Sequence, residues 1–391
     1  MVHQLEQFER KSVPGITRGR IHVAHLIHSL GSGGAEELLV EFAETAPSLG
    51  IETTVISLLG LNGSLNASRI ESAGARVVSV GLRSRWDVRS FRRTRALVRS
   101  LQPDVLQTHL KHADLVGAWV SRRLGLPMVS TLHRMEPAGA PLERFKRAAG
   151  ARARLSQAAR TLAVSDAQRR WYLETFDADP SMVVTVHNGI RDPDPVSEAI
   201  RLTVRRDLGI GPDECMVTML GVMRPGKGHA DLLAAVRLIP GGLPLRIVMA
   251  GDGDLAGDIS RSVLGDRLLS GRVVLPGWLD DVDRLLGASD LLVHPTRDDA
   301  LPTAVIHGLA AGLPVVASDV GGVGELVDSS VGILVPPGDP PALASALVAL
   351  FEDPGRRLAM GRRARERFER HFTASAWLNR LDAVYTAVLD R

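Results

Sequence analysis

The sequence is poor in cysteine, in aromatic residues and in long apolar runs. Cys215 is the one cysteine of 391 residues, which excludes an intrachain disulfide and a cysteine-based zinc or iron–sulfur site. Aromatic residues make up 4% of the chain, too few to interleave its basic stretches as in single-strand nucleic-acid sites. No run reaches the roughly eighteen apolar residues of a membrane span, and the polar start lacks the apolar core of a signal peptide. We therefore expect a cytoplasmic protein that does not bind nucleic acid.

The composition is that of a globular chain with uneven charge. It is 45% hydrophobic and 23% charged, which suffices for buried cores, and its length suits two domains. Residues 1–190 carry 25 basic residues against 17 acidic ones, and the rest of the chain carries 22 against 27. This asymmetry suggests an anionic partner for the first part, although a solvated surface with a charge bias would give the same counts.

Short apolar segments alternate with helical segments along the chain. IHVAHLIHSL (21–30) leads through a glycine turn into a helix in which Leu38, Leu39 and Phe42 recur at helical spacing. Further strand-like segments are TTVISLL, RVVSVGL, DVLQTHL, PMVSTLH, TLAVS and VVTVHNGI. The pattern restarts with CMVTMLGV, LRIVMAGDG, RVVLPGW, DLLVHPT, PVVASDVGG and GILVPPGD. Such alternation predicts an α/β fold with doubly wound parallel sheets.

A break in this pattern divides the chain. Residues 191–214 hold prolines and charges without an apolar strand, as a linker and a leading helix would. We predict a polar arm at 1–20, a Rossmann-like domain at 21–192, a second at 193–372, and a C-terminal helix at 373–391. Two such domains bind ligands outside the carboxyl ends of their strands, with an interdomain cleft as the site.

Two phosphate-binding patterns begin and are not completed. GVMRPGKG (221–228) has the glycines and the lysine of a P-loop, but Gly228 stands where serine or threonine would hold magnesium. Gly31 and Gly33 begin a dinucleotide fingerprint, but Glu36 occupies the third glycine position. Both a P-loop NTPase and a nicotinamide-dependent enzyme are therefore disfavoured.

Candidate metal ligands are few. His22, His25 and His28 lie on one strand, where His25 points away from the other two, so we interpret them as ordinary strand histidines. Asp252 and Asp254 form an Asp-x-Asp pair after a strand, but such pairs are common in acidic loops. We predict no metal site.

An ordered series of motifs runs along the chain. It reads GGAEE (33–37), TLH (131–133), HNGI (187–190), RPGKGH (224–229), AGDGD (250–254) and DALPTAVIHGLAAGLPVVASDVGGVGELV from 299. In this order the motifs resemble those of the retaining GT-B glycosyltransferases of family 4, over roughly residues 20–391. The resemblance implies a nucleotide-diphosphate sugar on the second domain, a hydroxyl acceptor on the first, and a final helix that packs back on the first. It implies no cofactor beyond this co-substrate and no metal.

The donor site implied by the resemblance centres on two loops. Arg224 and Lys227 flank a glycine turn, where they can neutralise phosphate oxygens, and Asp299 is expected near hydroxyls of the donor sugar. The helix after Asp299 offers free amides in its first turn, which form an anion site. The donor-binding residues that we predict are Gly33, Gly34, Gly251, Gly253, Trp278, Ala300, Leu301, Pro302, Thr303 and His307.

Three positions depart from the family pattern. Val222 stands where an arginine is usual, so Arg224 would act from two residues further on. Asp299 and His307 replace two glutamates that the family places eight residues apart. A neutral His307 can accept one hydrogen bond from a ribose hydroxyl but cannot bind two hydroxyls as a carboxylate does. Altered donor preference, weaker nucleotide binding and a non-catalytic sugar-nucleotide-binding homologue remain as alternatives.

The acceptor side depends on residues at strand ends. By resemblance His133 lies beside the transferred sugar, and we predict that His109 and Asn188 contact the acceptor. We assign no nucleophile, because no pair of carboxylates flanks the sugar, and the resemblance implies attack by the acceptor hydroxyl from the leaving-group face. The predicted catalytic residues are His133, Arg224, Lys227 and Asp299.

Arginine is concentrated in the first domain, in LRSRWDVRSFRRTRALVRS (82–100) and in residues 143–160. If these arginines surround the acceptor site, the acceptor is lipid-linked or otherwise anionic, with peripheral contact to an anionic membrane. A solvated helix face and a soluble acceptor fit the same residues. We predict an enzyme, a glycosyltransferase of cell-surface glycan, glycolipid or secondary-metabolite glycoside synthesis. A sugar-nucleotide epimerase is the further alternative, and it would need acid–base groups around the donor sugar.

Overall fold

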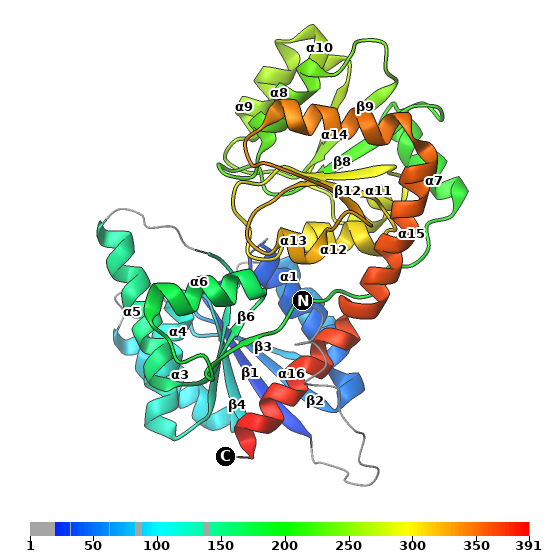
Figure 1. Cartoon of the computed structure of the whole chain (residues 1–391). Helices are drawn as coiled ribbons and strands as arrows, with labels where there is room; N and C mark the ends of the chain where they lie inside the picture. The colour runs from blue at the N-terminus through cyan, green and yellow to red at the C-terminus, as the bar shows by residue number, and fades with distance from the viewer. Residues whose placement is uncertain (1–19, 32, 62, 83–87, 136–140, 391) are drawn as a thin grey trace. The chain divides into compact units, whose positions relative to one another are not determined.

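The computed structural model describes residues 20–31, 33–61, 63–82, 88–135 and 141–390. They form two compact units, each with its own parallel sheet (Figure 1). Unit 1 takes the described residues up to Arg191 and those from Ala374 onward, and unit 2 runs from Asp192 to Thr373. The predicted polar arm, apart from Arg20, lies outside the described residues, as do Arg83 and Arg85.

The described residues of unit 1 hold a seven-stranded parallel sheet in the order β3-β2-β1-β4-β5-β6-β7. The strands are β1 (Ile21–Ile27), β2 (Ile51–Ser57), β3 (Arg76–Ser79), β4 (Val105–His109), β5 (Met128–Leu132), β6 (Ala158–Ala163) and β7 (Val183–Thr185). The helices are α1 (Gly34–Thr45), η2 (Ala46–Leu49), α2 (Leu65–Ser72), α3 (Val88–Leu101), α4 (Lys111–Leu124), α5 (Pro141–Gln157), α6 (Asp166–Phe176) and α16 (Ala374–Leu389).

Alternation along β1 divides the core of unit 1 into two layers. Val23 packs with Phe42 of α1 on one face of the sheet. Leu26 packs with Val98 of α3 and Val116 of α4 on the other face. Since side chains of a strand point alternately to its two faces, residues two apart share a layer. Both faces of the sheet are therefore covered, as the nearly continuous apolar strands require.

The last helix of the chain belongs to the core of unit 1. α16 buries Trp377, Leu381 and Tyr385 at helical spacing. Trp377 meets Phe42 of α1 edge to face, with 6.1 Å between the ring centroids. Tyr385 donates a hydrogen bond to Gln107 of β4. In Figure 1 this red helix lies against the sheet of unit 1, so α16 shares one core with β1 and α1.

The described residues of unit 2 hold a six-stranded parallel sheet in the order β10-β9-β8-β11-β12-β13. The strands are β8 (Cys215–Leu220), β9 (Leu245–Ala250), β10 (Val273–Gly277), β11 (Leu291–His294), β12 (Val315–Ser318) and β13 (Gly332–Val335). The helices are α7 (Glu198–Asp207), α8 (His229–Leu238), α9 (Ala256–Leu264), α10 (Arg267–Ser270), α11 (Val282–Gly287), α12 (Thr303–Ala310), α13 (Val323–Leu326), α14 (Pro340–Glu352) and α15 (Pro354–His371).

Both sheets reverse their strand order beside their first strand. In each unit the second and third strands lie on one side of the first strand and the fourth lies on the other. Ligands of doubly wound sheets bind at this switch point, outside the carboxyl ends of the strands. It lies between β1 and β4 in unit 1 and between β8 and β11 in unit 2. The predicted α/β fold with two Rossmann-like parallel sheets is confirmed. None of the described helices is long and apolar enough to span a bilayer.

Candidate active site

Unit 2 carries an ion pair at its switch point. Lys227 lies in the loop after β8 and Asp299 in the loop after β11, with Nζ and Oδ2 2.6 Å apart. The two side chains are 17% and 16% exposed, so both remain partly accessible. The main-chain N–H of Arg297 donates to the carbonyl of Gly226 over 2.8 Å and ties the two loops together. The structure thus brings the predicted Lys227 and Asp299 into direct contact.

Two histidines extend this cluster. His294, the last residue of β11, places Nε2 3.4 Å from Oδ2 of Asp299. Burial alone would raise the pKa of Asp299, but the hydrogen bond from His294 and the charge of Lys227 outweigh burial and hold that pKa well below its ordinary value. His229 begins α8, and burial, with Lys227 nearby, lowers the pKa of its ring to about 4. Asp299 is therefore ionised and His229 neutral at pH 7.

Close packing of loops explains several glycines at this edge. Gly228 has a φ of +81°, and a Cβ atom there would lie 1.8 Å from the carbonyl oxygen of Pro295. At Gly251, with φ +144°, a Cβ atom would lie 2.1 Å from the carbonyl oxygen of Gly221. Gly253, with φ +149°, faces the same β8 loop. The predicted donor-binding Gly251 and Gly253 therefore let the loop after β9 lie directly on the loop after β8.

A helix begins just beyond Asp299. Thr303 is the first residue of α12, and Pro302 precedes it in extended conformation. Ala300 and Leu301 are buried, with 2% and 4% exposure, so they can offer a ligand only their main chain. The first amides of a helix lack helical partners and favour anions, which makes this end of α12 a potential phosphate site.

Two other predicted donor residues pair with carboxylates other than Asp299. His307 on α12 directs Nδ1 at Oδ1 of Asp283 in α11, 3.3 Å away. Trp278 follows β10 and is 46% exposed, with Nε1 3.3 Å from Oδ1 of Asp280. His307 stands where the family has a glutamate, and the carboxylate of Asp283 on α11 lies beside it.

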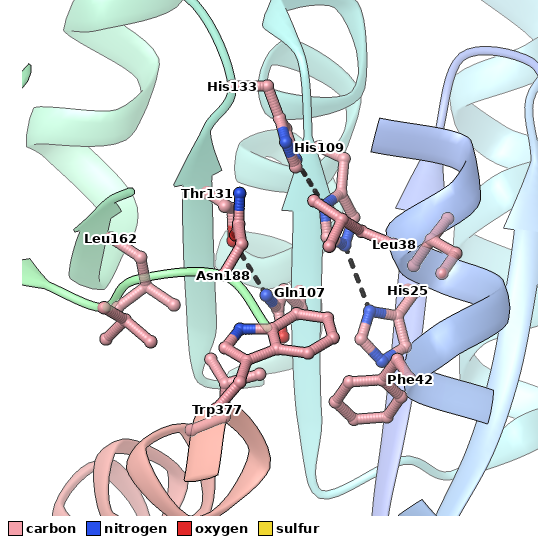
Figure 2. A pocket seen from close by; sticks show the side chains of 13 residues that line it. His25, Leu38, Phe42, Gln107, His109, Thr131, His133, Leu162, Asn188 and Trp377 are labelled. Carbon is pink, nitrogen blue, oxygen red and sulfur yellow. Dashed lines mark hydrogen bonds between the residues drawn. The ribbon is translucent and has the colours of Figure 1, made fainter. Parts of the chain in front are cut away.

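The equivalent edge of unit 1 holds a small pocket, shown in Figure 2. Predicted residues His109, His133 and Asn188 all line it. They are joined there by His25 from β1 and Trp377 from α16. The structure thus gathers the predicted acceptor residues and the predicted catalytic histidine at one switch point.

The pocket has a mixed polar and apolar lining and no formal charge at neutral pH. Burial lowers the pKa of His25 to about 3 and that of His133 to about 4, and it holds the pKa of His109 well below its ordinary value. Two of its lining residues are joined, since Gln107 donates from Nε2 to Oγ1 of Thr131 over 2.7 Å. The three histidines are therefore neutral and offer hydrogen bonds rather than charge.

Gly33 and Gly34 open α1 in unit 1. Gly33 precedes the helix in extended conformation, and a Cβ atom there would lie 2.5 Å from Oε2 of Glu36. Burial raises the pKa of Glu36, which occupies the position of the missing third fingerprint glycine. The close neighbour of Gly33 is therefore the flexible carboxylate of Glu36 in the same helix.

Sequence reasoning left several side chains of these two clusters unassigned. Among them are His25, Gln107 and Trp377 in the pocket of unit 1 and His229 and His294 beside Lys227 and Asp299. His25 was interpreted as an ordinary strand histidine, and the structure adds that it lines the pocket with its Nδ1 3.0 Å from Nε2 of His109. A signal was available for His294, which ends a strand just as His109 does.

The histidines of β1 and the Asp252/Asp254 pair were considered as metal ligands, and each of these groups has other contacts. His22 contacts Oγ1 of Thr54 through Nε2 at 2.9 Å, away from His25. Asp252 accepts the N–H of Gly253 at 2.7 Å. In the part of the chain that the structure describes, no three His, Cys, Asp or Glu side chains gather as metal ligands do.

The arginines of unit 1 divide into exposed and buried ones. α3 buries Ser90, Thr94 and Val98 and exposes its opposite face. The exposed arginines of α3 are Arg89, Arg92, Arg93 and Arg99. Arg154 of α5 is buried, and its Nη1 lies 2.7 Å from Oδ2 of Asp114. Counting Arg154 among the basic groups available to an acceptor is therefore wrong.

Two family models match the chain in succession. The model described as Glycosyltransferase Family 4 matches residues 32–192, and that described as Glycosyl transferases group 1 matches residues 214–353. Together they cover most of the chain and fall one on each unit. The chain therefore belongs to the group 1 glycosyltransferases of GT-B fold and is an enzyme of that class.

Relatives and solved structures agree with this assignment. The D-inositol 3-phosphate glycosyltransferase of Thermobispora bispora is 28% identical over 318 residues, which cover 76% of this chain and 74% of the relative. The UDP-Gal:alpha-D-GlcNAc-diphosphoundecaprenol alpha-1,3-galactosyltransferase of Escherichia coli is 26% identical over 290 residues, 68% of this chain and 71% of the relative. The crystal structure of Anabaena HepE with UDP has a TM-score of 0.83 at 20% identity and covers 94% of this chain and 100% of HepE. This last likeness shows the GT-B fold.

Proposed function

We propose that the protein transfers a sugar from a nucleotide-diphosphate sugar to a hydroxyl acceptor, with retention of configuration and without a metal ion. The observation that carries the proposal is the Lys227–Asp299 pair at the switch point of unit 2. The donor loses a diphosphate, and stabilising that departing charge supplies much of the rate. An ammonium group has three donors, and Asp299 takes one of them, so Lys227 can also donate to phosphate oxygens.

Other groups of unit 2 would complete the donor site. Arg224 in the β8 loop and the first amides of α12 would share the diphosphate with Lys227. Asp299, held ionised by its basic neighbours, is suited to accept hydrogen bonds from hydroxyls of the donor sugar. His307 beside Asp283 would meet the ribose. The name of the E. coli relative and the structure of HepE with UDP-glucose support a uridine-diphosphate sugar as the first donor to test.

The acceptor would bind in unit 1, at the pocket of His109, His133 and Asn188. Its hydroxyl would attack from the leaving-group face and pass its proton to the departing phosphate. The protein would then mainly position the two substrates and stabilise the charge of the departing diphosphate. The exposed arginines of α3 support an anionic or lipid-linked acceptor. Sedimentation with liposomes tests this part, and equal binding to neutral and anionic vesicles would speak against it.

The diphosphate site is tested by replacing Lys227. Lys227→Gln removes the charge but keeps an N–H donor for Asp299, so the fold is retained. We expect the affinity for uridine diphosphate, measured by calorimetry, to fall at least about 10-fold, because a charge-assisted hydrogen bond contributes about 1.5–3 kcal/mol. Arg261→Ala is the matched control, since Arg261 is 75% exposed on α9 and pairs only locally with Asp258. Unchanged affinity in Lys227→Gln would remove Lys227 from the site.

A further inference from the structure

Three histidine rings follow one another along the pocket of unit 1. Nδ1 of His25 lies 3.0 Å from Nε2 of His109, and Nδ1 of His109 lies 2.9 Å from Nε2 of His133. The rings come from β1, β4 and the end of β5, which are neighbours in the sheet. Figure 2 shows the two contacts as dashed lines, with the ring of His109 between those of His133 and His25.

The chemistry of the ring makes this series directional. A neutral imidazole has one N–H donor and one bare nitrogen that accepts. His109 is bonded through both of its nitrogens, so it donates to one neighbour and accepts from the other. Both bonds therefore run in the same direction, and the three rings carry their proton on the same nitrogen, all on Nδ1 or all on Nε2.

Neutrality of the rings is secured by their surroundings. His25 and His109 are buried, with 1% and 5% exposure. No carboxylate and no arginine or lysine is among the described residues that line the pocket. Burial keeps the pKa values of His25 and His133 near 3 and 4, so protonation does not disrupt the series at neutral pH.

The two ends of the series differ. Nε2 of His25 is buried and has no hydrogen-bond partner among the described residues. His25 packs against Phe42 with 4.3 Å between the ring centroids, so this end is closed. His133, at the other end, is partly exposed at the carboxyl edge of the sheet, where ligands of such folds bind. His133 is therefore the most exposed ring of the series, and it faces the edge at which a ligand would bind.

We propose that His25 and His109 are positioning residues that fix, through this series of hydrogen bonds, which nitrogen of His133 carries the proton and so whether His133 donates or accepts toward the substrate. The use of His133 in transfer rests on the proposed function. The state of the rings does not, and it can be measured without substrate.

The test reads the ring nitrogens directly. Long-range ¹H–¹⁵N correlation NMR of the ¹⁵N-labelled full chain at pH 7 distinguishes protonated from bare nitrogens in each histidine. We expect His25, His109 and His133 to be neutral and to share one tautomer. Different tautomers among the three, a mixture at His133, or a charged ring would overturn the proposal.

A variant at His25 then tests whether the tautomer of His133 depends on the hydrogen bond between His25 and His109. His25→Leu places an apolar side chain of similar size beside Phe42 and removes the hydrogen bond to His109. We expect His133 to populate both tautomers in this variant and the turnover number to fall several-fold, with the KM for the donor unchanged. His22→Gln on the same strand is the control and leaves both readouts as in the wild type. A His133 tautomer unaffected by His25→Leu would refute the positioning role, whether or not the protein transfers a sugar.

Discussion

At the scale of single residues, Asp299 is held in the candidate site by two basic side chains. Its Oδ2 lies 2.6 Å from Nζ of Lys227 and 3.4 Å from Nε2 of His294. A partly buried carboxylate is costly unless it is paired, and here two basic side chains compensate for its burial. The same two neighbours fix its orientation, which a group that holds donor hydroxyls requires.

Asp299→Asn tests this arrangement. The amide keeps the size of the side chain but loses the charge that pairs with Lys227, and with it charge-assisted hydrogen bonds worth about 1.5–3 kcal/mol. We expect kcat/KM for the donor to fall about 10- to 100-fold. Steady-state kinetics measure the loss, and Asp258→Asn on α9 serves as the control. A variant with wild-type kcat/KM would show that this carboxylate takes no part.

The sequence could predict Lys227 and Asp299 because each belongs to a motif that can be recognised along the chain. It could not predict that they touch, since their contact depends on β8 and β11 being neighbours in the sheet. His25 was missed for the same reason. Its partner His109 lies 84 positions further along and His133, which is bonded to His109, lies 108 positions further along. Local alternation predicts only the face of the strand on which His25 lies.

At the scale of elements, the β8 loop depends on two left-handed glycines. Gly226 has a φ of +87°, and a Cβ atom there would have nothing within 4 Å. At Gly228 a Cβ atom would lie 1.8 Å from the carbonyl oxygen of Pro295. Backbone strain acts at both positions, and a steric clash acts at Gly228 alone.

The comparison of Gly226→Ala with Gly228→Ala therefore separates the two effects. We expect Gly226→Ala to lower the free energy of unfolding by about 1 kcal/mol, from strain. Gly228→Ala should cost about 3 kcal/mol or more, because the backbone at Pro295 must also move. Chemical denaturation measures both values. Equal costs at the two positions would mean that the β8 and β11 loops are not packed as described.

Helices that begin directly after a glycine or a proline could be predicted from the sequence. α8 begins at His229 and α12 at Thr303, where a glycine and a proline precede them. α5 and the buried pair of Arg154 with Asp114 were not predicted. A helix rich in arginine gives no local sign that one of its arginines finds a carboxylate on another helix.

At the scale of the whole molecule, neutral buried histidines lie in both units. Burial lowers the pKa of His25 to about 3 and of His133 to about 4 in unit 1, and of His229 to about 4 in unit 2. An unfolded chain holds these rings near their ordinary pKa of about 6.5. Below that pH the unfolded chain binds more protons than the folded one, so the folded state loses stability as the pH falls.

The stability of unit 1 should therefore depend on pH between about 6.5 and 4. We expect its free energy of unfolding to fall by ~1.4 kcal/mol per pH unit for each of His25 and His133. Above pH 7 the same rings are neutral in both states, and the stability should be flat. Denaturant titrations followed by tryptophan fluorescence at pH 5, 7 and 8.5 measure this, and His25→Leu should reduce the slope. Equal stability at pH 5 and pH 7 would contradict the burial of neutral rings.

The charge asymmetry of the chain acquires a different meaning in the folded molecule. Unit 2 is the more acidic part, yet it holds Lys227 and Arg224 in the loop after β8, where an anionic diphosphate is proposed to bind. Net charge alone would have pointed to unit 1 for the anionic donor. Local geometry at the switch point outweighs the sum of distant surface charges, because salt screens charges beyond about 10 Å.

We propose that this glycosyltransferase moves a sugar from a nucleotide-diphosphate donor whose diphosphate is held by Lys227. The most direct measurement incubates the purified full chain with a panel of nucleotide sugars and hydroxyl acceptors and follows nucleoside-diphosphate release, product mass and anomeric configuration. We predict release coupled to transfer with the configuration retained, abolished in Lys227→Gln and preserved in Arg261→Ala. The proposed transfer would be contradicted by binding without turnover across the panel or by interconversion of nucleotide sugars without acceptor. Full turnover by Lys227→Gln would contradict the role of Lys227.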